Sequence, residues 1–406
     1  MNDFETIRKA CDTSSSISKT VIDEFLIYYA AVQYKLDRTM TEAFSAYRHV
    51  TNEFEKEWVN RLKAQYLAHQ IFKSGGLIRK MLPHAELKKL SPTKMHFLEQ
   101  HARQPWRFCF SIILENPAKD FFKMEDILTG EQFLLCSPGT SDINKSQATA
   151  LWFNLISFNG ACWQSFGPIG AYKSFEPDDI FFFATELDRR IETEEDIARN
   201  IEKNPLPYMM LLSGANIPIT VHKQDQMIMA YSEYPVDKFD TLALKKSFTS
   251  EFSHGVYRLS LKRWSGHPHF AQIYFDENKN IVLLAASTDR GYQALVNSIN
   301  PFGYPFSEDP DIRVNMSMLI TSEKILKKKI RLNDYDNLFQ IESSPEDIEM
   351  MANINAFMSL ILPDINAGRV PDIEKNAAKA GIDVETARNF YKAVSDKFGQ
   401  MDRKRG

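Results

Sequence analysis

The stretch Trp152-Phe-Asn-Leu-Ile-Ser-Phe158-Asn159-Gly160-Ala161-Cys-Trp-Gln-Ser-Phe166 places an Asn-Gly pair between two runs of mainly aromatic and aliphatic residues. Asn-Gly is the preferred pair for the type I′ turn of a two-residue hairpin loop, because both turn residues adopt a positive φ there. The pattern predicts a β-hairpin with strands at 152–158 and 161–166. This hairpin identifies the middle of the chain as β-rich.

The segment before the hairpin also has the two-residue period of β-strands. Between residues 108 and 114 the even-numbered side chains share one face and the odd-numbered side chains share the other. Residues 121–136 carry Gly130 at their centre, where glycine supplies the positive φ of a tight turn. A further strand is expected at 180–184. These strands together predict a small antiparallel β barrel or sandwich at 104–188.

Residues 1–103 show the three- and four-residue apolar spacing of amphipathic helices. The spacing is clearest at 41–81, where Thr41 is a candidate cap and Gly75-Gly76 a candidate break. This stretch predicts either a helical bundle or an extended dimerisation arm. We favour the bundle, because no strict heptad persists.

A second α+β domain is expected at 216–342, after a helical linker at 189–215 in which Thr193 precedes three acidic residues. Its predicted elements are a hairpin at 219–229, a helix at 241–252, strands at 256–264, 270–275 and 281–286, and a helix capped by Thr288 or Ser287. The final segment, 343–406, is predicted to be helical. The fold class is therefore α+β and multi-domain, with helices at both ends.

Composition limits the classes of function. With 406 residues the chain is long enough for two or three domains, and its net charge of −4 gives no global attraction for nucleic acid or an anionic membrane. Four widely spaced cysteines without a Cys-x-x-Cys pair do not suggest a disulfide scaffold. The N-terminus has no secretory signal pattern and no apolar run is long enough to span a bilayer, so we expect a cytoplasmic protein.

The C-terminal segment carries the one pattern that points to a function. Asp383 is a good helix cap, and Ala377, Gly381 and Ala387 have the spacing of the small residues where two helices cross closely. The stretch 377–388 resembles the helix-turn-helix of bacterial repressors.

This resemblance implies a nucleic-acid-binding surface on the second helix, formed by Thr386, Arg388, Asn389 and Lys392, with Glu385 beside them. Arg388 and Lys392 are four residues apart and could reach phosphates or guanine. The basic tail Arg403-Lys404-Arg405 would add attraction to the phosphate backbone. Asp383 and Glu385 would oppose that attraction, so we favour the alternative, an ordinary αα-hairpin that docks onto the body of this chain or onto another protein.

The histidines and the basic run are weaker candidates for a site. His267 and His269 would share one face of a strand, with His254 and Asp276 near in sequence, but a zinc or iron site needs a third well-placed ligand. The basic run 324–331 is typical of a solvated surface rather than of a nucleic-acid site.

No motif indicates catalysis. Cys162 lacks the local pattern of papain-like nucleophiles and is expected on a hairpin strand, as a core cysteine. The acidic pairs Asp178-Asp179 and Glu308-Asp309 stand beside prolines, as acids in loops do. The sequence contains no dinucleotide, phosphate-loop, serine-hydrolase or zinc-protease motif.

We therefore predict a binding or regulatory protein that uses no cofactor and acts through protein or nucleic-acid contacts, with self-association through the N-terminal helices as an option. One alternative is a hydrolase-like enzyme whose site lies between the two β-containing domains and uses His254, His267 or His269. Another is a structural assembly protein that uses the N-terminal helices as an arm. No catalytic residue is assigned, because an active site built from scattered residues leaves no motif.

Overall fold

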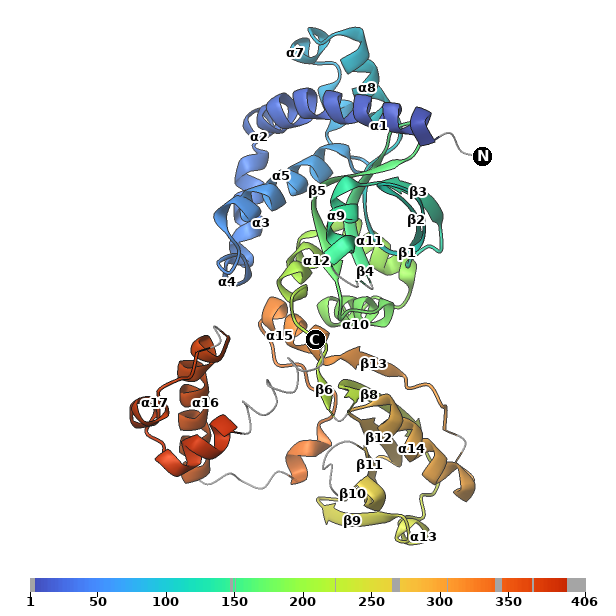
Figure 1. Cartoon of the computed structure of the whole chain (residues 1–406). Coiled ribbons are helices and arrows are strands. Elements are labelled where there is room, and N and C mark those ends of the chain that lie inside the picture. The colour runs from blue at the N-terminus through green and yellow to red at the C-terminus, as the bar shows by residue number, and fades with distance from the viewer. Residues whose placement is uncertain are drawn as a thin grey trace. The chain divides into compact units, whose positions relative to one another are not determined.

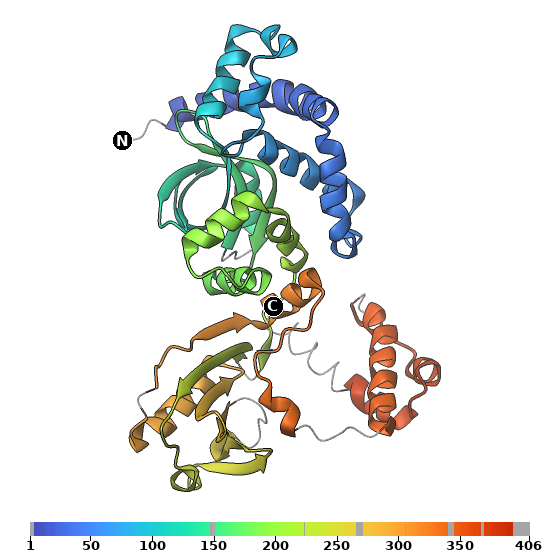
Figure 2. The same ribbon diagram turned by 180° about the vertical axis from the view of Figure 1, so that it is seen from behind.

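The computed structural model describes residues 4–146, 149, 151–222, 224–264, 271–304, 306–339, 345–366 and 369–392. The chain divides into two compact units, Met1–Tyr335 and Asp336–Gly406. The first unit holds the N-terminal helices and two β-sheet bodies, and the second is helical (Figure 1 and Figure 2). The predicted fold class is confirmed: an α+β chain with N-terminal helices, a small barrel, a further antiparallel sheet and a C-terminal helical segment.

Five strands close a barrel in the order β1-β2-β3-β5-β4. Their bounds are β1 (Arg107–Ala118), β2 (Phe121–Asp126), β3 (Gln132–Cys136), β4 (Leu151–Phe158) and β5 (Trp163–Tyr172). Neighbouring strands are antiparallel except β3 and β5, which pair in parallel with Leu135 opposite Trp163. Gly130, with a φ of 67°, lies in the turn between β2 and β3, as predicted.

Strands β4 and β5 form the predicted hairpin, but its loop is longer than a two-residue turn. Phe158 pairs with Trp163, so residues 159–162 all lie between the strands. The Asn159 backbone amide donates to the Cys162 carbonyl at 3.0 Å, and the Asn159 side-chain oxygen accepts two loop amides at 2.8 and 2.9 Å. The prediction of a type I′ turn is therefore wrong. The loop has four residues, and the Asn159 side chain accepts hydrogen bonds from its backbone.

The barrel strands are apolar on both faces. Their inward side chains form one core cluster, made of Cys109, Phe122, Met124, Phe133, Leu135, Trp152 and Ile156. Outward side chains such as Phe108, Phe110 and Phe153 join the largest core cluster together with the surrounding helices. The two faces predicted for residues 108–114 are thus confirmed, and burial on both sides explains why β4 is apolar except at Asn154 and Ser157.

The N-terminal region is a series of helices packed on the barrel. Their bounds are α1 (Phe4–Ser18), the π-helical stretch η1 (Lys19–Leu26), α2 (Ile27–Gln33), α3 (Leu36–Ala46), α4 (Arg48–Thr51), α5 (Lys56–Phe72), α6 (Ile78–Met81), α7 (Ala85–Lys88) and α8 (Pro92–Arg103). Residues 41–81 are divided among four of these helices, so they do not form one extended arm. Thr41 lies inside α3 instead of capping a helix, whereas Gly75, with a φ of 68°, lies in the expected break after α5.

The other helices of this region follow strands β3 and β5 in the chain. Their bounds are α9 (Pro138–Ser146), α10 (Pro177–Leu187), α11 (Glu194–Lys203), α12 (Leu206–Met210) and the 3-10 turn η2 (Leu211–Gly214). The strand predicted at 180–184 is wrong, because those residues lie within α10, where Pro177 at the first position and Asp179 in the first turn favour a helix start. Thr193 caps α11 by accepting the Asp196 amide at 3.2 Å.

The second β body is a six-stranded antiparallel sheet in the order β13-β8-β12-β11-β10-β9. Its strands are β8 (Ile228–Pro235), β9 (Phe248–Ser253), β10 (Val256–Leu261), β11 (Ala271–Asp276), β12 (Ile281–Ala286) and β13 (Ile312–Asn315). Helix α14 (Asp289–Ile299) packs on β11 and β12, and Thr288 caps it by accepting the Gly291 amide at 3.0 Å, as predicted.

The helix predicted at 241–252 is mostly wrong. Only α13 (Thr241–Leu244) is helical, because residues 248–253 pair with β10 as strand β9 and gain their backbone hydrogen bonds from that sheet. The remaining elements of the first unit are β6 (Val221–His222), β7 (Asp225–Gln226), η3 (Lys262–Trp264), η4 (Asn300–Phe302) and α15 (Met316–Leu326), and η5 (Tyr335–Phe339) begins at the last residue of this unit.

The second unit contains α16 (Pro345–Asn366), α17 (Ile373–Ala380) and a further helix at residues 384–392. Phe357, Ile361 and Ala377 are fully buried and form a core between these helices. No helix within the described ranges of the chain is both long enough and apolar enough to cross a bilayer.

A buried carboxylate joins the two β bodies of the first unit. Asp179 is only 1% exposed and accepts the Glu176 amide at 2.7 Å in the first turn of α10. It also accepts the backbone amide and the side-chain amide of Asn315, both at 2.7 Å, at the end of β13. Because β13 pairs with β8, these bonds connect the helices around the barrel to the six-stranded sheet.

Replacing Asp179 by asparagine tests this junction. Asp179→Asn keeps the shape of the side chain but turns one acceptor oxygen into a donor, which then faces N–H groups of Glu176 or Asn315. We expect the free energy of unfolding at pH 7 to fall by about 1–3 kcal/mol, because a buried N–H group loses its acceptor. Chemical denaturation followed by tryptophan fluorescence measures the change, and Asp178→Asn, an exposed neighbour, is the control.

The junction also predicts a pH dependence with a defined sign. Burial raises the pKa of Asp179 from 3.8 to about 6. The folded state therefore holds this proton more tightly than the unfolded state, and the contribution of Asp179 to stability falls as the pH rises from about 4 to about 6. The stability advantage of the wild type over Asp179→Asn should be largest near pH 4. An advantage that grows with pH would contradict this account.

Candidate functional site

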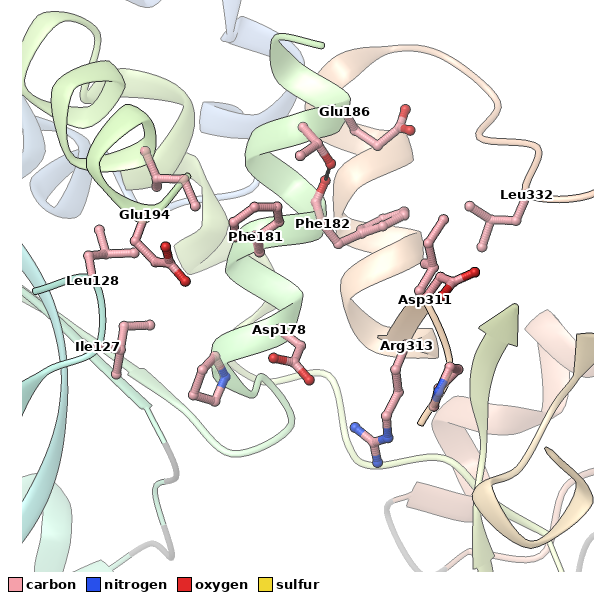
Figure 3. Close-up of a pocket in the computed structure, with 15 residues that line it drawn as sticks. Ile127, Leu128, Asp178, Phe181, Phe182, Glu186, Glu194, Asp311, Arg313 and Leu332 are labelled. Carbon is pink, nitrogen blue, oxygen red and sulfur yellow. Dashed lines mark hydrogen bonds between the residues drawn. The ribbon is translucent and has the colours of Figure 1, made fainter. Parts of the chain in front are cut away.

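A cavity of about 530 Å³ lies beside α10 in the first unit (Figure 3). Its lining comes from the residues after β2, from α10, from α11 and from the segment that leads into β13. We call it the α10 cavity. Its volume is within the range of pockets that bind small ligands.

The surface of the α10 cavity is largely apolar. Asp178, Phe181, Phe182 and Thr185 are spaced three and four residues apart along α10, so they share one face of that helix. The remaining apolar residues of the lining are Ile127, Leu128, Pro177, Ile197, Pro310, Ile312 and Leu332. Figure 3 shows Phe181 and Phe182 between the residues that follow β2 and the β13 segment.

The charged side chains around this apolar surface are mainly acidic: Asp178, Glu186, Glu194 and Asp311. Glu186 forms an ion pair with Lys328 at 2.7 Å, and Asp311 accepts the Glu233 amide at 3.1 Å. Neither Asp178 nor Glu194 has an ion-pair partner in the part of the chain that the structure describes. Both carboxylates are exposed to solvent and available to a ligand.

Arg313 also lines the cavity, but its charge is already neutralised. Its guanidinium donates to Asp289 at 2.8 and 3.0 Å and forms an ion pair with the Glu176 carboxylate. These acidic partners, Asp289 first, raise the pKa of Arg313 above its usual range. The lining therefore favours a cationic group over an anionic one.

Sequence reasoning missed this site. The interpretation of Asp178-Asp179 as loop acids is wrong, because both residues belong to the first turn of α10, where Asp179 is buried. The spacing of Asp178, Phe181 and Phe182 indicates one shared face only if 177–187 is assigned as a helix. No sequence pattern indicates that Leu332 and Arg313 lie beside this face, because they are distant from it in the chain.

The C-terminal helices have the local features on which the helix-turn-helix resemblance was based. Gly381 ends α17 with a φ of 69°. The Asp383 carboxylate accepts the amide and the hydroxyl of Thr386 at 2.9 and 3.2 Å, and the amide bond in particular lowers the pKa of Asp383. Ala377 and Ala387 are fully buried where the helices meet.

The predicted nucleic-acid residues lie on the outer side of the last described helix. Arg388, Asn389 and Lys392 are exposed and Thr386 is half-buried. Arg388 forms an ion pair with Glu374 at 2.6 Å in which both side chains are largely exposed, so the pair is weak. The basic tail Arg403-Lys404-Arg405 lies outside the described residues.

The candidate metal and hydrolase residues are not brought together by the described residues. His254 is exposed in the turn between β9 and β10, where its ring contacts the Ser253 hydroxyl at 2.8 Å. The Asp276 carboxylate accepts hydrogen bonds from the Asn278 amide at 2.9 Å and from the Tyr335 hydroxyl at 3.0 Å. His267 and His269 lie outside the described residues. Within those that are described, no group of three His, Cys, Asp or Glu side chains is arranged to hold a metal ion.

The basic side chains of the run 324–331 are largely exposed, and three of its lysines form ion pairs. Lys324 pairs with Glu53, Lys328 with Glu186 and Lys329 with Glu323. These ion pairs agree with the interpretation of the run as an ordinary charged surface.

Cys162 differs from its predicted position. It lies in the loop between β4 and β5 instead of on a strand, and it is buried beside Cys11. All four cysteines are buried and free.

No protein-family model, no curated protein and no solved structure matches this chain.

Proposed function

We propose that this chain is a binding protein that uses the α10 cavity to hold a peptide segment carrying a basic side chain next to an apolar one. The observation that supports the proposal is the pair of exposed carboxylates, Asp178 and Glu194, which have no ion-pair partner among the described residues and lie at the edge of an apolar surface that contains Phe181. An apolar side chain would enter the cavity, and a lysine or arginine beside it would meet the two carboxylates.

The two kinds of contact have different roles. Burial of one large apolar side chain contributes about 1.5–3 kcal/mol, so the apolar surface supplies most of the affinity. Exposed ion pairs contribute about 0–1 kcal/mol each, but like charges repel, so the acidic rim selects against acidic peptides. A short peptide bound in this way should have a modest affinity that weakens as the salt concentration rises.

A nucleic-acid contact through the helix at 384–392 is a second candidate function. It is supported by the exposure of Arg388, Asn389 and Lys392 on the side of the helix opposite the buried Ala387. The ion pair with Glu374 competes for the Arg388 charge, so this contact would be weak in the unmodified chain.

A charge-reversal experiment tests the peptide site. The probe is a fluorescein-labelled Lys-Phe-Phe-Lys peptide, and its binding to the full chain is measured by fluorescence anisotropy. Asp178→Lys combined with Glu194→Lys should raise the dissociation constant about ten-fold or more, because two attractive contacts become repulsive. The charge-reversed peptide Glu-Phe-Phe-Glu should bind the double variant better than it binds the wild type.

Glu195→Lys is the matched control for this experiment. Glu195 is the neighbour of Glu194 on α11 but does not line the cavity. Glu195→Lys should leave the affinity for the Lys-Phe-Phe-Lys peptide within about two-fold of the wild type. The proposal is wrong if the wild type does not bind this peptide, or if Glu195→Lys weakens binding as much as the double variant does.

The nucleic-acid candidate predicts opposite effects for two sets of substitutions. Arg388→Ala combined with Lys392→Ala should reduce the dependence of duplex-DNA affinity on salt, with the slope of log K against log salt falling by about 2. Glu374→Gln should strengthen binding, because it releases the Arg388 guanidinium. A salt titration with a labelled DNA duplex measures both.

Lys379→Ala is the control for the loss of a nearby exposed lysine on α17. If Lys379→Ala changes the slope as much as the double substitution, the contact is a diffuse one and the helix at 384–392 is not the site. If the wild type retains no DNA at low salt, the candidate function is excluded.

A further inference from the structure

Three cysteines that are far apart in sequence meet at one end of the barrel. Cys11 comes from α1, Cys136 from the end of β3 and Cys162 from the β4–β5 loop. They are 2%, 5% and 2% exposed and belong to one buried cluster with Phe121. The sulfur atoms of Cys11 and Cys162 are 3.3 Å apart, although 151 residues separate them in the chain.

Helix α1 is held over these cysteines by polar contacts. Arg8, one turn before Cys11, pairs with Asp120 at 3.1 Å and lies over the ring of Phe121, 5.0 Å from its centre. The Gln164 side chain donates to the Cys11 carbonyl at 3.1 Å. These contacts hold Cys11 next to the two barrel cysteines.

The surroundings of Cys11 favour its thiolate. The Cys162 sulfur lies 3.3 Å from the Cys11 sulfur, and the Asn159 side-chain amide donates to the Cys11 sulfur at 3.3 Å. The neighbouring thiols, Cys136 first and then Cys162, together with Asn159 and Arg8, lower the pKa of Cys11 although burial opposes them. The proximity of Cys11 raises the pKa of Cys136 and of Cys162. Cys11 is therefore the strongest candidate nucleophile of the three, because the thiolate is the reactive form.

We propose that Cys11, Cys136 and Cys162 form a peroxide-sensitive thiol site in which Cys11 is oxidised first and Cys162 closes a disulfide with it. The proposal is carried by the 3.3 Å sulfur–sulfur contact across two separate elements and by the set of donors around Cys11. Cys136 is the third thiol of the site and lies in the same buried cluster as Cys11 and Cys162.

The reaction balances with hydrogen peroxide as the oxidant. The Cys11 thiolate attacks one peroxide oxygen, the O–O bond breaks, and the hydroxide that leaves takes up a proton to become water. Cys11 is then a sulfenic acid. The Cys162 sulfur attacks the Cys11 sulfur, an S–S bond forms, and the sulfenic oxygen leaves as water with the Cys162 proton. Two thiols have lost two electrons and one peroxide has become two waters.

The disulfide would fasten α1 to the barrel. In the reduced chain α1 is held by the Arg8, Gln164 and apolar contacts, each of which can open locally. A covalent bond from Cys11 to the β4–β5 loop closes a long loop of chain and suppresses that opening. Oxidation would thus change how readily the N-terminal helix leaves the barrel, and a reducing agent would restore the original state.

Thiol counting on the full chain tests the proposal. The reduced protein is treated with hydrogen peroxide, denatured and alkylated with N-ethylmaleimide, and its intact mass is measured. Two of the four thiols should become unreactive, and a peptide map without reductant should contain Cys11 linked to Cys162. Dithiothreitol should restore all four. Tryptic cleavage after Lys9 and Lys19, which are exposed, should be about ten-fold slower in the oxidised chain.

Two substitutions separate the site from general oxidation. Cys109→Ala removes a buried cysteine that faces the barrel interior and should leave the peroxide response unchanged. Cys11→Ala should retain its three thiols and show no slowing of cleavage. The proposal is overturned if the wild type keeps four reactive thiols after peroxide, if Cys109 is the thiol consumed, or if Cys11→Ala loses two thiols as fast as the wild type. The wild-type peptide map needs no variant to fold.

Discussion

The buried carboxylate of Asp179 is the contact on which the arrangement of the first unit depends. A carboxylate taken out of water is costly unless its oxygens find donors, and here Glu176 and Asn315 supply them. The donors come from two bodies, because Asn315 ends a strand of the six-stranded sheet and Glu176 precedes α10. Glu176 alone leaves part of this group without a donor, so the buried position of Asp179 depends on the two hydrogen bonds that Asn315 donates from the other body.

The same helix start shapes the α10 cavity. Successive residues on a helix point about 100° apart, so Asp178 and Asp179 face different surroundings although they are neighbours. Asp179 is buried and its oxygens accept hydrogen bonds within the protein, while Asp178 is exposed at the cavity edge. Arg313 lies two residues before Asn315 on β13, and its pairing with Asp289 and Glu176 removes a positive charge from the lining. The acidic character of the cavity is therefore a consequence of how the two bodies are joined.

At the end of the barrel where the three cysteines meet, the β4–β5 loop forms part of the contact with α1. The Asn159 side chain accepts two loop amides and donates toward Cys11, so the residue that shapes the β4–β5 loop also contacts the N-terminal helix. A shorter type I′ turn would have left no room for Cys162 in the loop. The extra loop residues thus place a thiol against α1, and the β4–β5 hairpin becomes part of the contact between the barrel and the helices.

The sequence by itself determined the local structure: the β4–β5 hairpin, the caps at Thr193 and Thr288, and the C-terminal turn at Gly381, because these depend on side chains and φ values within a few residues. It misassigned 180–184 and 248–252, where short apolar runs fit both helix and strand and the neighbouring elements decide. Only the tertiary structure decided that Asp179 is buried, that the α10 cavity forms, and that Cys11 lies against Cys162. Those features join residues distant in the chain, and neither periodicity nor spacing carries information about such contacts.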